Sequence, residues 1–235
     1  MQALGVLLFC LAGYGLARPF GRGDRWVQGF LGAAARAFGA RVTIVGRPIP
    51  RGVLFVANHL SWMDILVLGG ATGTAFVSKE SVSRWPLVGW LARIGGTIFV
   101  RRESRTAARG QADALADALR TGRPAAFFPE GTTGNGVVLA PFRASLFASV
   151  APPPPGIAVQ PVAIDYGAAA RQIAWIDGES TLANARRLIA RPGPLAVTLR
   201  FLDPIDPAQR ADRKSIARAA EAAIAAALPR DAVLS

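Results

Sequence analysis

The sequence is poor in the side chains that most often carry metal sites and disulfide bonds. Its 235 residues include one histidine, His59, and one cysteine, Cys10. One imidazole and one thiol cannot supply the usual zinc ligand sets, so a metalloenzyme is disfavoured and we expect no metal. A single cysteine also excludes an intrachain disulfide, which is compatible with a reducing compartment. If the chain does acid–base chemistry near neutral pH, His59 is the first candidate.

Long apolar runs and lysine are also scarce. No stretch reaches the roughly 20 apolar residues of a standard transmembrane helix, although 51% of the residues are hydrophobic. Only two of the 27 basic residues are lysines, and the net charge is +12. So basic a chain should attract nucleic acid, anionic lipid headgroups or an acidic carrier protein. The charge is dispersed and no nucleic-acid motif is present, so we expect no nucleic acid as a partner.

The first 40 residues predict a pair of membrane-associated helices. Residues 3–17 carry no charge. As a helix they would span about 22 Å, short of the roughly 30 Å hydrocarbon core. No basic residue precedes this run and no cleavage motif follows it, so we do not expect a secretory signal peptide. The sequence leaves open whether the segment spans the bilayer or dips into one leaflet, and its length favours dipping. Arginines come directly after it, which predicts a protein body on the cytoplasmic face of the inner membrane.

The second segment, Trp26–Ala40, has an amphipathic pattern. Its apolar positions fall within about 100° of arc on a helix, with arginines nearly opposite. One interpretation is a helix that lies in the headgroup region of one leaflet. The alternative is a helix that simply packs on the core of the protein.

Residues 41–235 predict one α/β domain with a mixed, mostly parallel sheet flanked by helices, because strand-like and helix-like runs alternate. Helical patterns occupy Thr106–Thr121 and Asp212–Leu228, and Pro152–Pro155 is expected to be a stiff loop. The expected strands are Val42–Val45, Val53–Ala57, Ala75–Ser78, Thr97–Arg101, Ala125–Phe128, Val159–Ile164 and Leu195–Leu202.

Asp64 follows His59 by five positions. In a regular helix this spacing would put the two side chains about 140° apart. A bent segment at a strand-to-helix junction would bring them together, and Asp64 would then hold one ring nitrogen and leave the other as a base. The plain alternative is a helix-capping histidine with a solvated aspartate. We expect the hydrogen bond.

Three further blocks follow the His59 block. The block Gly96–Arg102 contains the expected strand Thr97–Arg101 and ends in two arginines, Arg101 and Arg102, and another strand runs into the turn Pro129–Thr133. The last block, Val159–Ile164, is a strand that contains a proline. Each has an ordinary explanation: arginines at strand ends are usually solvated, the turn has a common composition, and a strand proline usually marks an edge or a bulge.

The position of these blocks points to one cleft. Ligands of α/β sheets gather at the carboxyl ends of strands, and the first three blocks put their polar residues just past such ends. We therefore expect Arg102, Glu130 and Gly131 in the same cleft as His59. A base, cations that bind phosphate oxygens, and the backbone N–H groups of Gly131 and Thr132 suit transfer onto a hydroxyl beside an anionic group.

With all four blocks in this order, the chain resembles the lysophospholipid acyltransferase family, best known for its 1-acylglycerol-3-phosphate acyltransferases. The family signature is Asn/His-x4-Asp, Gly-x-x-Phe-x-x-Arg, Phe-Pro-Glu-Gly-Thr and a proline-containing strand. The resemblance covers roughly residues 40–205, and the amino-terminal helix pair also fits it.

The resemblance implies roles for individual residues. His59 is the general base that takes the proton of the acceptor hydroxyl, and Asp64 orients it; the hydroxyl then attacks the thioester without an acyl-enzyme intermediate. No cofactor is implied beyond the donor substrate, acyl-CoA or acyl carrier protein. The residues implied in substrate binding are Asn58, Lys79, Arg101, Arg102, Glu130, Gly131 and Thr132.

The resemblance leaves two acceptors open. The most direct implication is conversion of 1-acylglycerol-3-phosphate to phosphatidic acid. Many members that form phosphatidic acid carry arginine and serine after Glu-Gly-Thr, whereas this chain has Thr133 and Gly134. The longer run here, followed by Pro-Phe-Arg, resembles the branch that acylates lyso-ornithine lipid, which stays as the alternative acceptor.

Two other classes of protein would explain part of the sequence. A serine hydrolase would use Ser61 beside His59, but the chain has no Gly-x-Ser-x-Gly elbow. A non-catalytic basic membrane-binding protein would explain the charge, but it would not need the His59/Asp64 pair. Membrane lipids are expected partners in either case, and the sequence does not indicate an oligomeric state.

Overall fold

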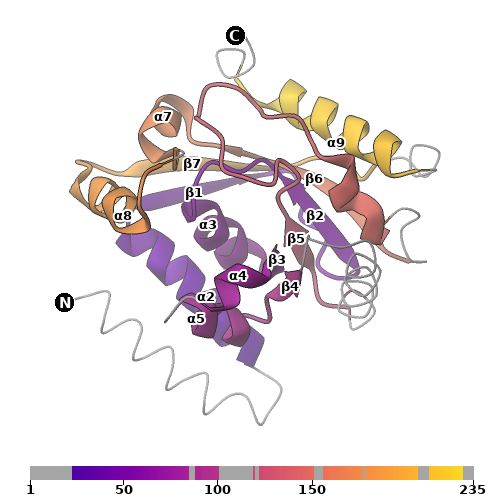
Figure 1. Ribbon diagram of the computed structural model, residues 1–235, viewed down its shortest axis with the longest axis horizontal. Helices are drawn as coiled ribbons and strands as arrows, with labels where there is room; N and C mark the ends of the chain where they lie inside the picture. The colour runs from indigo at the N-terminus through magenta and orange to yellow at the C-terminus, as the bar shows by residue number, and fades with distance from the viewer. Residues whose placement is uncertain are drawn as a thin grey trace.

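A computed structural model describes residues 23–84, 88–100, 119, 122–150, 156–176, 178–205 and 212–229. It shows a sheet with helices packed on both faces (Figure 1). The predicted segments 3–17, 106–118 and 152–155 lie outside the described residues. In chain order the elements are α2 (Gly23–Ala37), β1 (Ala40–Val45), β2 (Val53–Ala57), α3 (Met63–Thr72), β3 (Ala75–Lys79), α4 (Glu80–Ser83), α5 (Val88–Ile94), β4 (Ile98–Val100), β5 (Ala125–Phe127), η2 (Ala144–Val150), β6 (Ala158–Asp165), η3 (Gly167–Ala169), α7 (Ala170–Ile173), α8 (Thr181–Ala190), β7 (Leu195–Phe201) and α9 (Arg213–Ala227).

The described strands form one seven-stranded sheet in the order β1-β7-β6-β2-β5-β3-β4. Neighbouring strands are parallel except β6 and β7, so the predicted mixed, mostly parallel sheet is confirmed. All of the expected strands are present. The interpretation of the strand proline as an edge marker is wrong, because β6 lies between β7 and β2. Pro161 has no N–H to donate toward β7; its carbonyl accepts from the Leu202 N–H at 3.0 Å, and the Leu202 carbonyl accepts from the side-chain amide of Gln160 at 2.9 Å.

The sheet is buried on both faces, as the continuous apolar composition of its central strands predicts. All residues of β2 are 0% exposed. Phe55 points into a core layer with α3 residues, whereas Leu54 points into the opposite layer with α9 residues. Because both faces are covered, the residues that follow β2 emerge at the carboxyl edge of the sheet.

The predicted carboxyl-terminal helix is present as α9. Its amino terminus is closed by a capping box, in which Asp212 accepts hydrogen bonds from the backbone of Lys214 and Ser215. The predicted apolar stripe is buried at Ile216 and Ile224. This helix covers the face of the sheet opposite to α3.

Helix α2 overlaps the second segment predicted to be membrane-associated, Trp26–Ala40, and it packs closely on α3. The Gln28 amide donates to the carbonyls of Gly70 and Ala71, both at 3.3 Å. Gly32 and Gly70 meet where the helix backbones approach. One face of α2 therefore packs on the domain, in agreement with the alternative interpretation of this segment as a helix that packs on the core. Among the described residues, no helix has the length and apolar content needed to cross a bilayer.

The close approach of α2 and α3 predicts that Gly70→Ala destabilises the fold. A Cβ at Gly70 would lie 2.6 Å from the Cα of Gly32, a backbone atom that cannot move aside. We expect a loss of about 1–3 kcal/mol in the free energy of unfolding, measured by urea denaturation. Gly29→Ala is the matched control, because a Cβ there meets nothing within 4 Å. It should stabilise the helix by up to about 1 kcal/mol, and equal effects of the two changes would contradict this packing.

Candidate active site

The segment between β2 and α3 is fixed to the sheet by Asn58. Its side chain is buried, its amide donates to the Ile164 carbonyl at 2.9 Å, and its oxygen accepts from the Ile164 N–H at 2.8 Å. These bonds tie the end of β2 to β6. Both polar groups of the amide are thus engaged with backbone, and substrate binding by Asn58 stays a prediction.

His59 and Asp64 form the hydrogen bond expected from the sequence. His59 Nδ1 lies 2.8 Å from Asp64 Oδ2. The same carboxylate oxygen accepts from the backbone N–H groups of Leu60 and Ser61, at 2.7 and 2.9 Å. The segment therefore curls around the carboxylate, which is how a spacing of five residues brings the pair together. Because Nδ1 faces Asp64, Nε2 is the ring nitrogen left to accept a proton.

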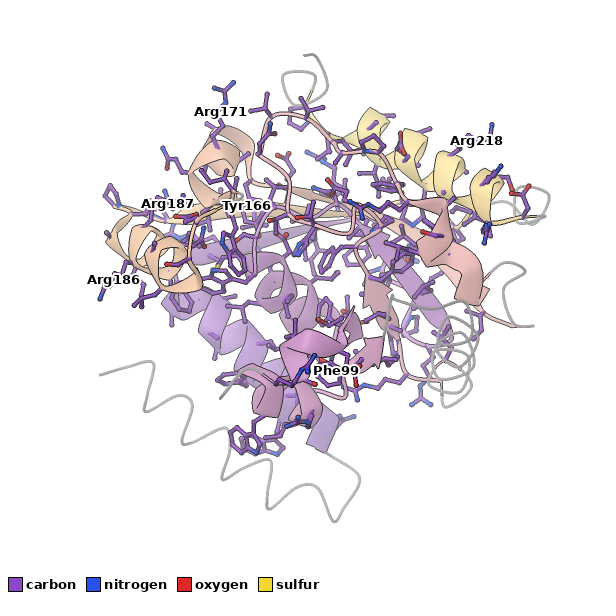
Figure 2. All side chains as sticks on the ribbon, viewed as in Figure 1. Phe99, Tyr166, Arg171, Arg186, Arg187 and Arg218 are labelled. Carbon is purple, nitrogen blue, oxygen red and sulfur yellow. The ribbon has the colours of Figure 1, made fainter. Side chains whose placement is uncertain are left out.

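Tyr166 completes the support of Asp64. Its hydroxyl donates to Asp64 Oδ1 at 2.6 Å, and both side chains are buried. Burial, together with the Asp64 charge, raises the pKa of Tyr166 well above its ordinary value, so the phenol stays a donor. Figure 2 shows Tyr166 in the interior. Sequence reasoning missed this residue; the available signal was a tyrosine two positions after the predicted strand Val159–Ile164.

Two phenylalanine rings fix the plane of the imidazole. The rings of His59 and Phe128 are stacked, with centroids 3.9 Å apart and planes at 8°. Phe128 in turn lies 5.9 Å from Phe76. The His59 side chain is 17% exposed. The base is thus held on one side by a carboxylate and on one face by an aromatic ring, yet remains open to solvent.

Glu130 supports the catalytic segment from the end of β5. It is 3% exposed; Oε1 accepts from the His59 N–H at 2.6 Å and Oε2 from the Ala140 N–H at 3.1 Å. Burial raises the pKa of Glu130 from 4.5 to about 7, against the lowering effect of these two hydrogen bonds. Gly131 adopts φ 77° and its N–H reaches the Phe128 carbonyl, which closes the turn, while Thr132 is exposed.

Of the predicted cations, strand order places Lys79. Strands β2, β5, β3 and β4 are parallel neighbours, so their carboxyl ends lie along one edge of the sheet. Lys79 is the last residue of β3, on the edge that also carries His59 and Glu130. Arg101 and Arg102 directly follow β4 in the sequence and lie outside the described residues. Substrate binding by these cations and by Glu130, Gly131 and Thr132 stays a prediction.

The fold and this edge of the sheet define a class of enzyme. A buried aspartate orients a histidine whose free nitrogen can take a proton from a hydroxyl, which suits group transfer by general base catalysis. The chain belongs to the acyltransferase family, whose family model, described as Acyltransferase, matches residues 41–165.

Several known proteins are similar over most of the chain. A lyso-ornithine lipid O-acyltransferase from Pseudomonas aeruginosa is 40% identical, over 87% of this chain and 79% of that protein. One from Rhodobacter capsulatus is 36% identical, over 89% and 79%. The crystal structure of a 1-acyl-sn-glycerophosphate acyltransferase from Thermotoga maritima superposes with a TM-score of 0.67 at 27% identity, covering 92% of this chain and 84% of that one.

The Tyr166 hydrogen bond predicts a specific defect in Tyr166→Phe. Loss of the phenol leaves Oδ1 of the buried Asp64 carboxylate without its side-chain donor, so the orientation of Asp64, and of the His59 ring that Asp64 holds, is less well fixed. We expect kcat to fall about tenfold with the acceptor KM little changed, measured by steady-state kinetics. Phenylalanine preserves the shape of the ring, so a normal kcat would refute the positioning role.

The buried Glu130 carboxyl predicts a component of stability that declines as pH rises. The unfolded carboxyl ionises near 4.5 and the folded one near 7. Between these values the folded state binds more protons, so its stability falls with rising pH, by roughly 3 kcal/mol in total. The advantage of the wild type over Glu130→Gln should therefore shrink between about pH 5 and about pH 8, measured by urea denaturation. An advantage that grows with pH would contradict this assignment.

Proposed function

We propose that the protein is an O-acyltransferase that moves a fatty acyl group from a thioester donor to the free hydroxyl of a membrane lysolipid. The observation that carries this proposal is the hydrogen bond from His59 Nδ1 to the buried carboxylate of Asp64, which leaves Nε2 as the base. Such an arrangement suits proton abstraction from a neutral hydroxyl, the step that acyl transfer to an alcohol requires.

His59, assisted by Asp64, is the only proton carrier that the proposed reaction needs. Nε2 of His59 takes the hydroxyl proton as the oxygen attacks the thioester carbonyl, and Asp64 stabilises the imidazolium that forms. The tetrahedral intermediate collapses with cleavage of the carbon–sulfur bond. The proton then passes from His59 to the departing thiolate, so an ester and a thiol leave and the base is regenerated. In this proposal Lys79, Arg101 and Arg102 attract the anionic groups of donor or acceptor.

Lyso-ornithine lipid is the acceptor that we favour. Relatives with that activity in their names match 87% and 89% of this chain. A 1-acyl-sn-glycerol-3-phosphate acyltransferase from Neisseria gonorrhoeae is 39% identical but matches only 45% of it. The position that carries arginine in many phosphatidic-acid-forming members is Thr133, whose hydroxyl donates to the Trp175 carbonyl at 2.6 Å. Thr133 therefore provides a hydrogen bond to the backbone, in place of a cation that could bind phosphate.

Lysophosphatidate is the second candidate. The sequence prediction put it first, and the name of the Thermotoga maritima structure supports it. In both cases the proposed donor is acyl-CoA or acyl carrier protein, each an anionic partner that suits a chain of net charge +12. The proposed location is the cytoplasmic face of the inner membrane, with residues 1–40 associated with the lipid.

An acyl-transfer assay with the full chain in detergent tests this proposal. Acyl-CoA and acyl carrier protein serve as donors, and lyso-ornithine lipid and lysophosphatidate as acceptors. His59→Ala should lower kcat by about 10²–10⁴-fold, because the general base is lost. The variant should still bind anionic vesicles, which shows that the protein is folded. Full activity in this variant would refute the mechanism, and transfer to lysophosphatidate alone would reverse the preferred acceptor.

A further inference from the structure

Helix α8 carries large aliphatic side chains on the side that faces away from the protein. Leu182 is 60% exposed and Ile189 is 66% exposed. They are seven residues apart, so they lie within about 20° of one another around the helix, with Arg186 about 40° from Leu182 on the same side. We call these three residues the outer face of α8. Figure 2 shows Arg186 pointing outward at the end of the molecule opposite to α9.

This exposure belongs to a helix that is firmly held. The inner side of α8 is buried at Asn184 and Leu188. Ser180 caps the helix by accepting from the Ala183 N–H at 3.2 Å. Arg187 donates to Glu179 at 2.7 Å and to the Ala174 carbonyl at 2.8 Å. Packing of the domain therefore does not require the aliphatic side chains of the outer face. The firmly held helix α8 keeps these side chains exposed to water.

The inner side of α8 contacts the catalytic segment. The indole N–H of Trp62, three residues after His59, donates to the Asn184 oxygen at 2.8 Å. The Asn184 amide donates to Glu179 at 2.7 Å, and the Trp175 N–H donates to the Leu60 carbonyl at 2.8 Å. A partner that binds the outer face is therefore separated from the segment that carries His59 only by helix α8.

Charge and size indicate what this face binds. Helix α8 contains no acidic residue; Arg186 lies between its exposed aliphatic side chains, and Arg191 follows its end. Glu179 is engaged by Arg187, which lowers the pKa of that carboxyl. Arginines beside exposed aliphatic side chains suit lipid phosphates above acyl chains. A face of so few side chains is small beside the roughly 800 Å² per partner of a stable protein–protein interface.

We propose that the outer face of α8, together with the 54% exposed Ile176 that precedes the helix, docks on the surface of an anionic lipid bilayer. Leu182, Ile189 and Ile176 enter the region between headgroups and acyl chains, and Arg186 pairs with lipid phosphate. This contact is separate from residues 1–40. It holds the catalytic segment beside the bilayer, where a lysolipid acceptor resides.

A fluorescent label tests the contact directly. In a Cys10→Ser background, Leu182→Cys is labelled with a polarity-sensitive thiol reagent and mixed with phosphatidylglycerol vesicles. The emission should move to shorter wavelength as the probe leaves water. Ala222→Cys, at an exposed position of α9, is the matched control and should not respond. A Leu182 label that keeps its aqueous emission while the protein sediments with vesicles would overturn the proposal.

A second pair of variants measures the energetic contribution. Leu182→Glu with Ile189→Glu should weaken binding to phosphatidylglycerol vesicles about tenfold, because two apolar contacts are lost and two anions added. Ala222→Glu with Ala226→Glu makes the same change in net charge on exposed positions of α9 and should have little effect. Equal weakening by both pairs would indicate net charge alone and refute docking by α8. A shift of the Leu182 label that depends on protein concentration without vesicles would instead indicate a second copy of the chain.

Neither experiment depends on acyl transfer. If the docking face is absent while activity persists, only this inference fails; if vesicle docking is present without activity, the proposed function fails.

Discussion

A carboxylate withdrawn from water must be compensated by hydrogen bonds or a positive charge, and the Asp64 carboxylate receives four hydrogen-bonding contacts. Three converge on Oδ2 from His59, Leu60 and Ser61, and the fourth reaches Oδ1 from Tyr166. Removing any of them leaves part of a buried charge without a partner, which costs more than the same bond on a surface. The geometry of the catalytic segment is therefore set by the hydrogen bonds that the buried Asp64 carboxylate requires.

Two buried carboxyls act on His59 in different ways. Asp64 engages the ring and Glu130 the backbone N–H, so the position of the residue and the orientation of its ring are fixed independently. The environments differ as well, since burial dominates at Glu130 and raises its pKa to about 7. The Pro-Glu-Gly turn thus supports the base from the neighbouring strand. Its glycine with φ 77° allows the chain to reverse while the glutamate points inward.

The strands and the His59–Asp64 contact were predictable because both depend on local pattern. Short Val, Ile and Phe runs identified the sheet, and a polar residue after a buried strand identified its carboxyl edge. Tyr166 and Asn184 were not predictable in the same way, since their partners lie 102 and 122 positions away in the chain. Asn58 also has a distant partner that the local pattern does not reveal, since its amide bonds across the sheet to Ile164.

The residues that follow Glu130 are joined to the catalytic segment by hydrogen bonds. The Gly134 N–H donates to the His59 carbonyl at 2.7 Å, and Thr133 is tied to Trp175, whose N–H holds Leu60. Thr133, at which this chain differs from many phosphatidic-acid-forming relatives, therefore belongs to a set of hydrogen bonds that surround His59. An arginine there would add a cation but lose the tether to Trp175. A change of residue at Thr133 would therefore also alter the loop that holds the histidine, so the identity of this residue and the geometry of the catalytic segment are coupled.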